Sequence, residues 1–200
     1  MIVLDSREPG SVIAKVQAYC KHNKIAVIPD EGMKPPALPV GDVLVVGKYM
    51  MFVVERKTSD DLYRSIVDGR WESQVSRLSR VHEDVSIEQM LAGKRRPVIH
   101  RVIIPLVLVY GWSPRHLETG KLGRVSGRPT GMLYASYMNA QLSAILSGVP
   151  VLFCGSLRYP EYLHGLLKYA NKRRHKIVEN VSINSFLDDE IVIDMEDDND

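Results

Sequence analysis

Residues 41–57 read GDVLVVGKYMMFVVERK, and this stretch decides the fold of the chain. Two apolar runs flank Gly47-Lys48, and a two-residue loop with glycine first is typical of a type II′ hairpin turn. Successive side chains on a strand point to opposite faces, so Glu55 and Lys57 share a face roughly 6.6–6.8 Å apart. The stretch therefore predicts an antiparallel hairpin that carries an acid and a base side by side.

The predicted turn also fixes a register for the hairpin. In that register Val46 pairs with Tyr49, and Asp42 pairs with Val53. Asp42 and Glu55 are then diagonal neighbours on one face, about 7–8 Å apart at the backbone. This separation places both carboxylates within reach of one shared ion.

Paired carboxylates of this kind favour a hard divalent cation. Mg²⁺ prefers a few carboxylates, completed by water and substrate phosphate, and it can lower the pKa of a bound water. Lys57 would orient the attacking water or neutralise developing negative charge, and Asp5, after the apolar run Ile2-Val3-Leu4, is a candidate third acid. Each residue taken alone could instead be a solvated strand end or half of a surface ion pair.

Four ordered motifs run from Asp5 to Leu78. They are Asp5-Ser-Arg7-Glu8, Leu38-Pro-Val-Gly41-Asp42, Glu55-Arg56-Lys57 with Asp61-Leu62, and Ser65-Ile66 followed by Asp68-Gly69-Arg70, Gln74 and Arg77-Leu78. Together they resemble the XPF family of structure-specific endonucleases, a branch of the PD-(D/E)xK nuclease superfamily. The resemblance covers most of the chain and implies a restriction-endonuclease-like α/β fold, with a central mixed sheet flanked by helices.

The resemblance also implies roles for individual residues. Asp5, Asp42 and Glu55 are expected to bind Mg²⁺, for which Mn²⁺ would substitute, with Lys57 as the catalytic lysine. Arg56 and Asp61 are expected in the same cleft, lined or supported by Arg7, Glu8, Arg70 and Gln74. Asp61 could instead be a first-turn helix charge, and Arg70 and Gln74 could lie on a solvated helix face.

The implied activity is that of a metal-dependent endonuclease that cuts branched DNA, such as flaps and forks, in repair, recombination or replication. Three alternatives stay open. They are a Holliday junction resolvase, a non-catalytic scaffold that binds branched DNA, and a catalytic subunit that is silent until a partner joins it. Many relatives carry a helix-hairpin-helix region after the nuclease, which does not fit in 200 residues. Relatives also dimerise through their C-terminal helices, so a homodimer is expected.

Composition agrees with a protein that follows phosphates. Residues 188–200 hold eight acidic and no basic residues, so residues 1–187 carry 26 basic against 16 acidic residues, a net charge of +10 with histidine neutral. A basic body suits DNA, although it would also suit an anionic membrane surface. Two isolated cysteines, no signal peptide and no apolar run of about 20 residues favour an intracellular protein of the cytoplasm, nucleoid or nucleus, with no membrane partner.

The remaining pattern alternates strands and helices, as in an α/β sheet. We expect strands at 2–5, 25–29, 42–46, 49–55, 103–110 and 151–154, and helices at 11–24, 58–68, 71–83, 130–147 and from a cap at Ser156 to about 175. Thr58 or Ser59 would cap the second helix. The apolar residues Leu142, Ile145, Leu146, Leu163, Leu166 and Leu167 lie at helical spacing, which predicts core packing.

We divide the chain into a nuclease domain, 1–178, and a flexible acidic tail, 179–200. The tail begins with Asn180–Leu187, which resembles the peptide that binds the sliding clamp PCNA, with Ile183, Phe186 and Leu187 as its apolar plug. A segment that docks on the domain itself is the alternative. Two basic segments, 84–101 and 111–129, could contact DNA or be ordinary solvated loops.

Overall fold

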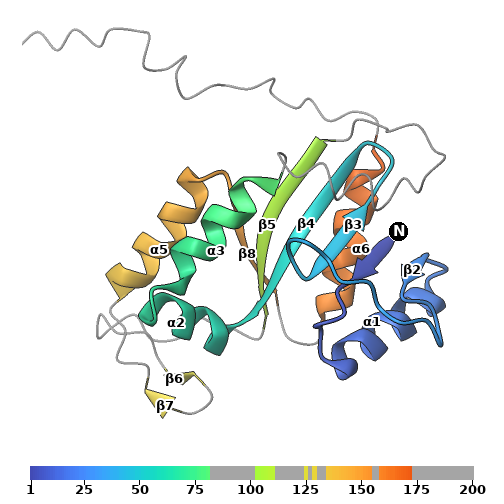
Figure 1. Ribbon diagram of the computed structural model, residues 1–200, viewed down its shortest axis with the longest axis horizontal. Coiled ribbons are helices and arrows are strands. Elements are labelled where there is room, and N and C mark those ends of the chain that lie inside the picture. Colours follow the sequence, from blue (N-terminus) through green and yellow to red (C-terminus); the bar gives the residue numbers. More distant parts are fainter. Residues whose placement is uncertain (82–101, 111–123, 126–127, 130–133, 155–157, 173–200) are drawn as a thin grey trace, which may run out of the picture.

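The computed structural model describes residues 1–81, 102–110, 124–125, 128–129, 134–154 and 158–172. These residues form a mixed six-stranded sheet with helices on both faces (Figure 1). The expected fold class is therefore confirmed. The predicted tail, with its clamp-binding peptide, and segment 84–101 lie outside the described residues, as does most of segment 111–129.

The six strands lie in the order β2-β1-β3-β4-β5-β8. Their bounds are Ile2–Leu4 (β1), Val27–Ile28 (β2), Val43–Val46 (β3), Met50–Thr58 (β4), Val102–Tyr110 (β5) and Val151–Cys154 (β8). β3 is antiparallel to both β1 and β4, whereas β2 runs parallel to β1, and β4, β5 and β8 run parallel to one another. A separate two-stranded piece, β6 (Arg124–Val125) and β7 (Arg128–Pro129), lies within the expected loop 111–129.

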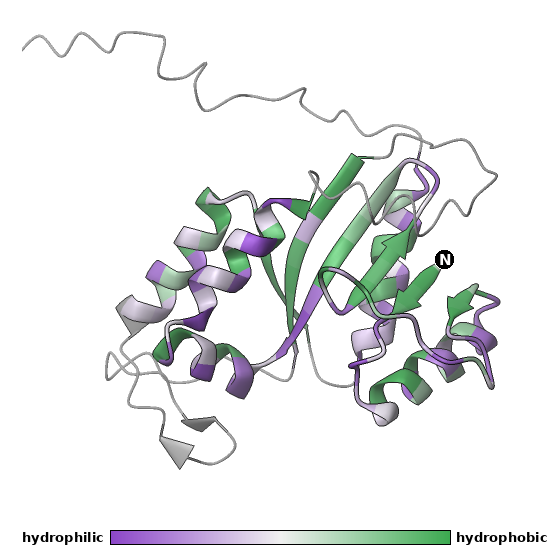
Figure 2. Ribbon diagram, viewed as in Figure 1, coloured by the Kyte–Doolittle hydropathy of each residue, from purple (hydrophilic) through white to green (hydrophobic). Residues whose placement is uncertain are grey.

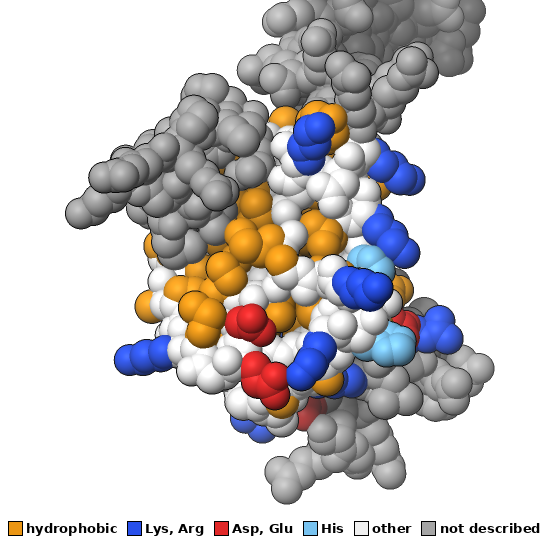
Figure 3. All heavy atoms as spheres, turned by 90° about the vertical axis from the view of Figure 1, so that its right-hand side faces the viewer, with side chains coloured by type: hydrophobic (Ala, Val, Ile, Leu, Met, Phe, Trp, Pro, Cys, Tyr) orange, Lys and Arg blue, Asp and Glu red, His pale blue; other side chains and the backbone are white. Residues whose placement is uncertain are grey.

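The helices divide between the two faces of the sheet. α1 (Gly10–His22) and α6 (Tyr159–Ala170) cover one face, and α2 (Ser59–Val67), α3 (Arg70–Ser79) and α5 (Tyr134–Leu146) cover the other (Figure 1). On the α1 side, Lys and Arg side chains are spread around a hydrophobic area (Figure 3). Within the described residues, no helix has the length and apolar character needed to cross a membrane.

Two hydrophobic cores follow from the strand alternation, and the central strands are the most apolar part of the fold (Figure 2). Met51 and Val53 of β4 pack beneath α2, α3 and α5, whereas Phe52 and Val54 pack beneath α1 and α6. Both faces of β4 are thus buried, which explains why residues 50–54 form a continuous apolar run.

The predicted hairpin exists, but its turn lies one residue further along the chain. Val46 pairs with Met51, and the Gly47 N–H donates to the Met50 carbonyl at 2.9 Å, so the turn residues are Lys48 and Tyr49. The predicted pairs Val46–Tyr49 and Asp42–Val53 are therefore wrong. Each β3 residue pairs with the β4 residue two positions beyond the predicted partner. A shift of two leaves every side chain of β4 on its predicted face.

Tertiary packing explains the shifted turn. A Cβ on Gly47 would lie 2.3 Å from the Cβ of Ala170 and 2.6 Å from its carbonyl oxygen, at the end of α6. That end also holds the turn, since the Tyr49 N–H donates to the Ala170 carbonyl at 3.1 Å and the Lys48 N–H donates to Asn171 Oδ1 at 2.8 Å. Glycine at position 47 therefore allows α6 to approach closely, and residues at the end of α6 accept the hydrogen bonds donated by the turn.

Two predictions about helices need correction. Leu163 and Leu167 are buried as predicted, but the side of α5 that carries Leu142, Ile145 and Leu146 is exposed, at 49%, 55% and 76%. α6 begins at Tyr159 with Arg158 at its N-cap position, so Ser156 is not the cap, and it ends at Ala170, earlier than expected. The Thr58 cap of α2 is confirmed, because its side chain accepts from the Asp61 N–H.

The packing of Gly47 yields a stability prediction. Gly47→Ala forces a methyl group against the backbone of Ala170, and it should lower the free energy of unfolding by about 1–3 kcal/mol, as overpacking does. Gly165→Ala is the matched control, since a Cβ there meets nothing within 4 Å and the residue lies inside α6. It should raise stability by up to about 1 kcal/mol. Urea unfolding measures both, and equal stability of the two variants would contradict this account.

Candidate active site

Glu55 and Lys57 lie on the face of β4 that is covered by α2 and α3. The alternation that sends Val53 into that core sends both charged side chains the same way. Both residues are buried, with 8% and 6% of their surface exposed. The predicted pairing of an acid and a base on one face of this strand therefore agrees with the structure.

Asp42 reaches the same place through an irregularity at the start of β3. Val43 pairs with Val54, and the Asp42 N–H also donates to the Val54 carbonyl, at 2.8 Å. Two residues thus oppose one, which is the arrangement of a β-bulge, a device that re-aims side chains. Gly41 permits it, because its φ is +76° and a Cβ would lie 2.9 Å from Val53 Cγ1.

The two acids repel each other in a poorly solvated place. Burial raises the pKa of Glu55, and the nearby charge of Asp42 raises it further, while Lys57 acts in the opposite direction. Burial also raises the pKa of Asp42, opposed by the Arg56 N–H, which donates to Asp42 Oδ2 at 2.8 Å. The nearest cation to Glu55 is Arg77, whose Nη2 lies 4.0 Å from Oε2.

Lys57 lies beside this acid pair as a buried ammonium group. Burial lowers its pKa, and the charges of Glu55, Asp61 and Asp42 raise it in part. Across the described parts of the chain, its Nζ forms neither a hydrogen bond nor an ion pair within 4.0 Å. A desolvated cation of this kind can interact with an anionic group that enters the site.

Asp5 differs from the other two acids because its carboxylate is already saturated. Oδ1 accepts from the Arg7 backbone N–H at 2.7 Å and from Arg7 Nε at 2.6 Å, and Oδ2 accepts from the Leu38 N–H and from Arg7 Nη2. Burial alone would raise the pKa of Asp5, but these hydrogen bonds outweigh it and lower the pKa. Asp5 therefore anchors Arg7 and the loop at Leu38, next to the acid pair.

Arg56 and Glu8 lie apart from Glu55 and Lys57. Arg56 points to the opposite face of β4, where its Nε donates to Glu8 Oε2 at 2.6 Å and its Nη1 donates to the Tyr110 hydroxyl. Its guanidinium also stacks 5.1 Å from the centre of the Tyr110 ring. The structure thus gives Arg56 and Glu8 a buried ion pair on the α1 and α6 side of β4, from which the charge of Arg56 also lowers the pKa of Asp42.

The predicted site residues on α2 and α3 lie in three different environments. Asp61 accepts from the Thr58 hydroxyl at 2.7 Å, so it completes the helix start, as the alternative interpretation held. Arg70 pairs with Asp68 at the surface. Gln74 turns inward, and its Oε1 is buried without a hydrogen-bond partner in the described structure.

Arg77 is the residue that the site prediction missed. Its guanidinium comes closest to Glu55, although the motif had been recognised without a role for this residue. The spacing could have placed Arg77 near the site, because Arg70, Gln74 and Arg77 are four and three residues apart and therefore share one helix face.

The acid pair fits a divalent cation. Burial raises the pKa of both carboxylates, and the charge of Asp42 raises that of Glu55 further, so a positive ion between them would stabilise their charged forms. No group of three acidic, histidine or cysteine side chains able to hold a metal occurs among the residues described. Such an ion would therefore depend on water and substrate phosphate for its other ligands, as Mg²⁺ commonly does.

Comparison with known proteins finds a matching family model and similar solved structures. The family model for the ERCC4 domain matches residues 5–120. XPF from Aeropyrum pernix is 21% identical, with a TM-score of 0.55 over 86% of this chain and 65% of that chain. XPF from Aeropyrum pernix in complex with DNA is 19% identical, with a TM-score of 0.52 over 92% of this chain and 72% of that chain.

The structural matches establish a shared fold at these identities, and the chain spans 65% of the length of the first of them. Among curated proteins, none matches the chain significantly. The family model covers more than half of the chain and includes each motif from Asp5 to Leu78. The chain therefore belongs to the ERCC4 domain family, the family of XPF-type nucleases that its motifs resemble.

Proposed function

We propose that this protein is a divalent-metal-dependent endonuclease that cuts DNA near branches such as flaps and forks. The observation that carries the proposal is the group formed by half-buried Asp42 with buried Glu55 and Lys57, in which two acids lie beside an ammonium that has no hydrogen bond or close ion pair within the described residues. Membership of the ERCC4 domain family supports it. A relative of the same fold has been solved in complex with DNA.

In this proposal each residue has a separate task. Asp42 and Glu55 would hold the ion, Mg²⁺ or in its place Mn²⁺, which when bound polarises the scissile phosphate and lowers the pKa of water. The Lys57 ammonium holds positive charge where the phosphate gains negative charge. Asp5 keeps Arg7 in place. The hydrogen bonds from Arg7 to Asp5 raise the pKa of the guanidinium, and the charges of Asp42 and Glu55 raise it further.

The proposal extends to place and partners. We expect the protein to act inside the cell, in the cytoplasm, nucleoid or nucleus, in DNA repair, recombination or replication. A sliding clamp would bind Ile183, Phe186 and Leu187, which lie outside the described residues. A peptide of residues 178–192 that fails to bind the host clamp by calorimetry would remove this partner from the proposal.

The first prediction concerns cleavage. Glu55→Gln keeps the size of the side chain and removes one candidate ligand, so the rate should fall at least about 100-fold. Glu72→Gln, an exposed carboxylate on α3, should leave the rate unchanged. The assay uses end-labelled 3′-flap, fork, four-way junction and plain duplex DNA with Mg²⁺ or Mn²⁺.

The pattern of products decides between the candidate activities. Branch-selective cutting that Glu55→Gln abolishes supports the proposed endonuclease, and symmetric cutting confined to the four-way junction would identify a resolvase. Binding without cutting, in either metal, would contradict an enzyme that is active alone. The clamp would then be the first component to add.

A second prediction concerns stability in EDTA. Burial and Asp42 raise the pKa of Glu55, so folding disfavours its charged form, and the resulting penalty is present when the pH exceeds the folded pKa. Glu55→Gln should therefore raise Tm at pH 7.5. The gain should shrink as the pH falls and disappear below the ordinary carboxyl value of about 4.3, where the wild-type group is protonated in both states. Glu72→Gln should show no such trend, and a lower Tm for Glu55→Gln at pH 7.5 would contradict the account.

A third prediction concerns the homodimer, which we propose forms through α5. Leu142, Ile145 and Leu146 place three large apolar side chains on its exposed side. Exposed apolar patches of this kind are typical of protein interfaces. Sedimentation should show a dimer that Leu146→Glu dissociates, whereas a monomer at every concentration would reject the proposal.

A further inference from the structure

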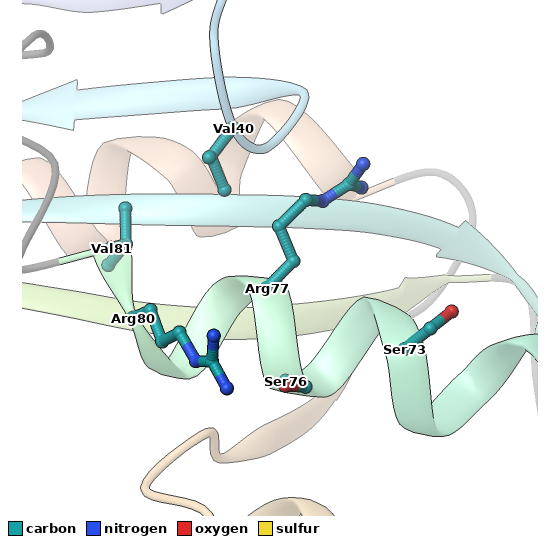
Figure 4. A pocket seen from close by; sticks show the side chains of 6 residues that line it. All are labelled: Val40, Ser73, Ser76, Arg77, Arg80 and Val81. Carbon is teal, nitrogen blue, oxygen red and sulfur yellow. The ribbon is translucent and has the colours of Figure 1, made fainter.

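A cavity of about 430 Å³ lies along α3, beside the candidate active site but outside its acid pair. Its lining residues, shown in Figure 4, are Val40, Ser73, Ser76, Arg77, Arg80 and Val81. Three of them come from α3 and Arg80 is its C-cap residue, at positions i, i+3, i+4 and i+7, which lie along one side of a helix. The cavity is therefore lined mainly by one polar stripe of a single helix, closed on its far side by apolar residues.

The chemistry of this lining is that of an anion site. Two arginines and two serines line it, and none of the lining residues is acidic. In the described structure Arg80 forms no ion pair, and the only carboxylate within 4.0 Å of Arg77 is Glu55, at the limit of that distance. Ser73 donates its hydroxyl proton to the Arg70 carbonyl, so its oxygen remains an acceptor, whereas no hydrogen bond engages the Ser76 hydroxyl among the described residues.

Arg77 connects the cavity with the acid pair. It lines the cavity and also lies 4.0 Å from Glu55. Arg80, at the C-cap of α3, lies three residues beyond Arg77, about 4.5 Å along the helix axis at 1.5 Å per residue. Since nucleotides rise about 3.4 Å per step along one strand of a duplex, this distance corresponds to about one nucleotide.

We propose that this cavity binds a backbone phosphate of the DNA, about one nucleotide from the bond that is cut. Arg77 and Arg80 form charge-assisted hydrogen bonds to the phosphate oxygens, and the Ser76 hydroxyl donates a further one. Val40 and Val81 close the site without adding a competing charge. The inference rests on the proposed function for its ligand, and it assigns residues that the acid pair and Lys57 do not include.

The test measures DNA affinity without catalysis. Fluorescence anisotropy follows a labelled 3′-flap DNA and a duplex RNA of matching sequence, in EDTA, at salt concentrations from 50 to 200 mM. The variants are Arg80→Gln and Ser76→Ala in the full chain, with thermal unfolding as the check that each is folded. Lys168→Gln is the matched control, because it removes one exposed positive charge from α6, on the opposite face of the sheet (Figure 1).

Arg80→Gln should weaken DNA binding about three- to tenfold and reduce the slope of log K against log salt by about 0.7–0.9, the value of one phosphate contact. Ser76→Ala should weaken binding about twofold to fivefold with little change in slope, because it removes a neutral hydrogen bond. Lys168→Gln should change neither quantity.

Three outcomes would overturn the inference. They are wild-type affinity and slope for Arg80→Gln, an equal loss for Lys168→Gln, and a loss confined to the duplex RNA. The measurement also separates the two proposals, since binding in EDTA needs no cleavage. If the protein cuts DNA normally but Arg80→Gln binds DNA as well as wild type, only the phosphate-binding role of the cavity is refuted. If the protein never cuts DNA but Arg80→Gln weakens binding, only the nuclease activity is refuted.

Discussion

The structure depends on the pairing of β4 between β3 and β5. β4 is hydrogen-bonded on both edges and covered by helices on both faces, so each of its side chains must enter one of two cores. Alternation then sends Glu55 and Lys57 under α2 and α3 and sends Arg56 under α1 and α6. One strand thus supplies a candidate chemical site on one face and a structural ion pair on the other.

Burial of charge distinguishes these two roles. A buried charge needs a partner, and Asp5 has Arg7, while Glu8 has Arg56 at 2.6 Å. Within the described residues, the group of Asp42, Glu55 and Lys57 lacks such close pairing, although burial disfavours the charged form of all three. The molecule therefore keeps an electrostatic conflict in one place, which is typical of functional sites rather than of structural ones.

The sequence predicted most of the sheet, because long apolar runs and strand alternation depend on local pattern. It also predicted the shared face of Glu55 and Lys57, and the cap at Thr58. It misplaced the hairpin turn, because Gly47 packs against Ala170, more than a hundred residues away in the sequence. It could not pair Arg56 with Glu8, find Arg77 beside Glu55 or foresee the exposed side of α5, because each depends on which helix packs where.

The central claim is that Asp42 and Glu55 form a divalent-cation site next to Lys57. The most direct measurement is anomalous X-ray scattering from crystals of the protein soaked in Mn²⁺, beside crystals of Asp42→Asn. The account predicts a manganese peak in contact with both carboxylates, and no peak in the variant. A peak at other residues, or none at concentrations of Mn²⁺ that support cleavage, would contradict it.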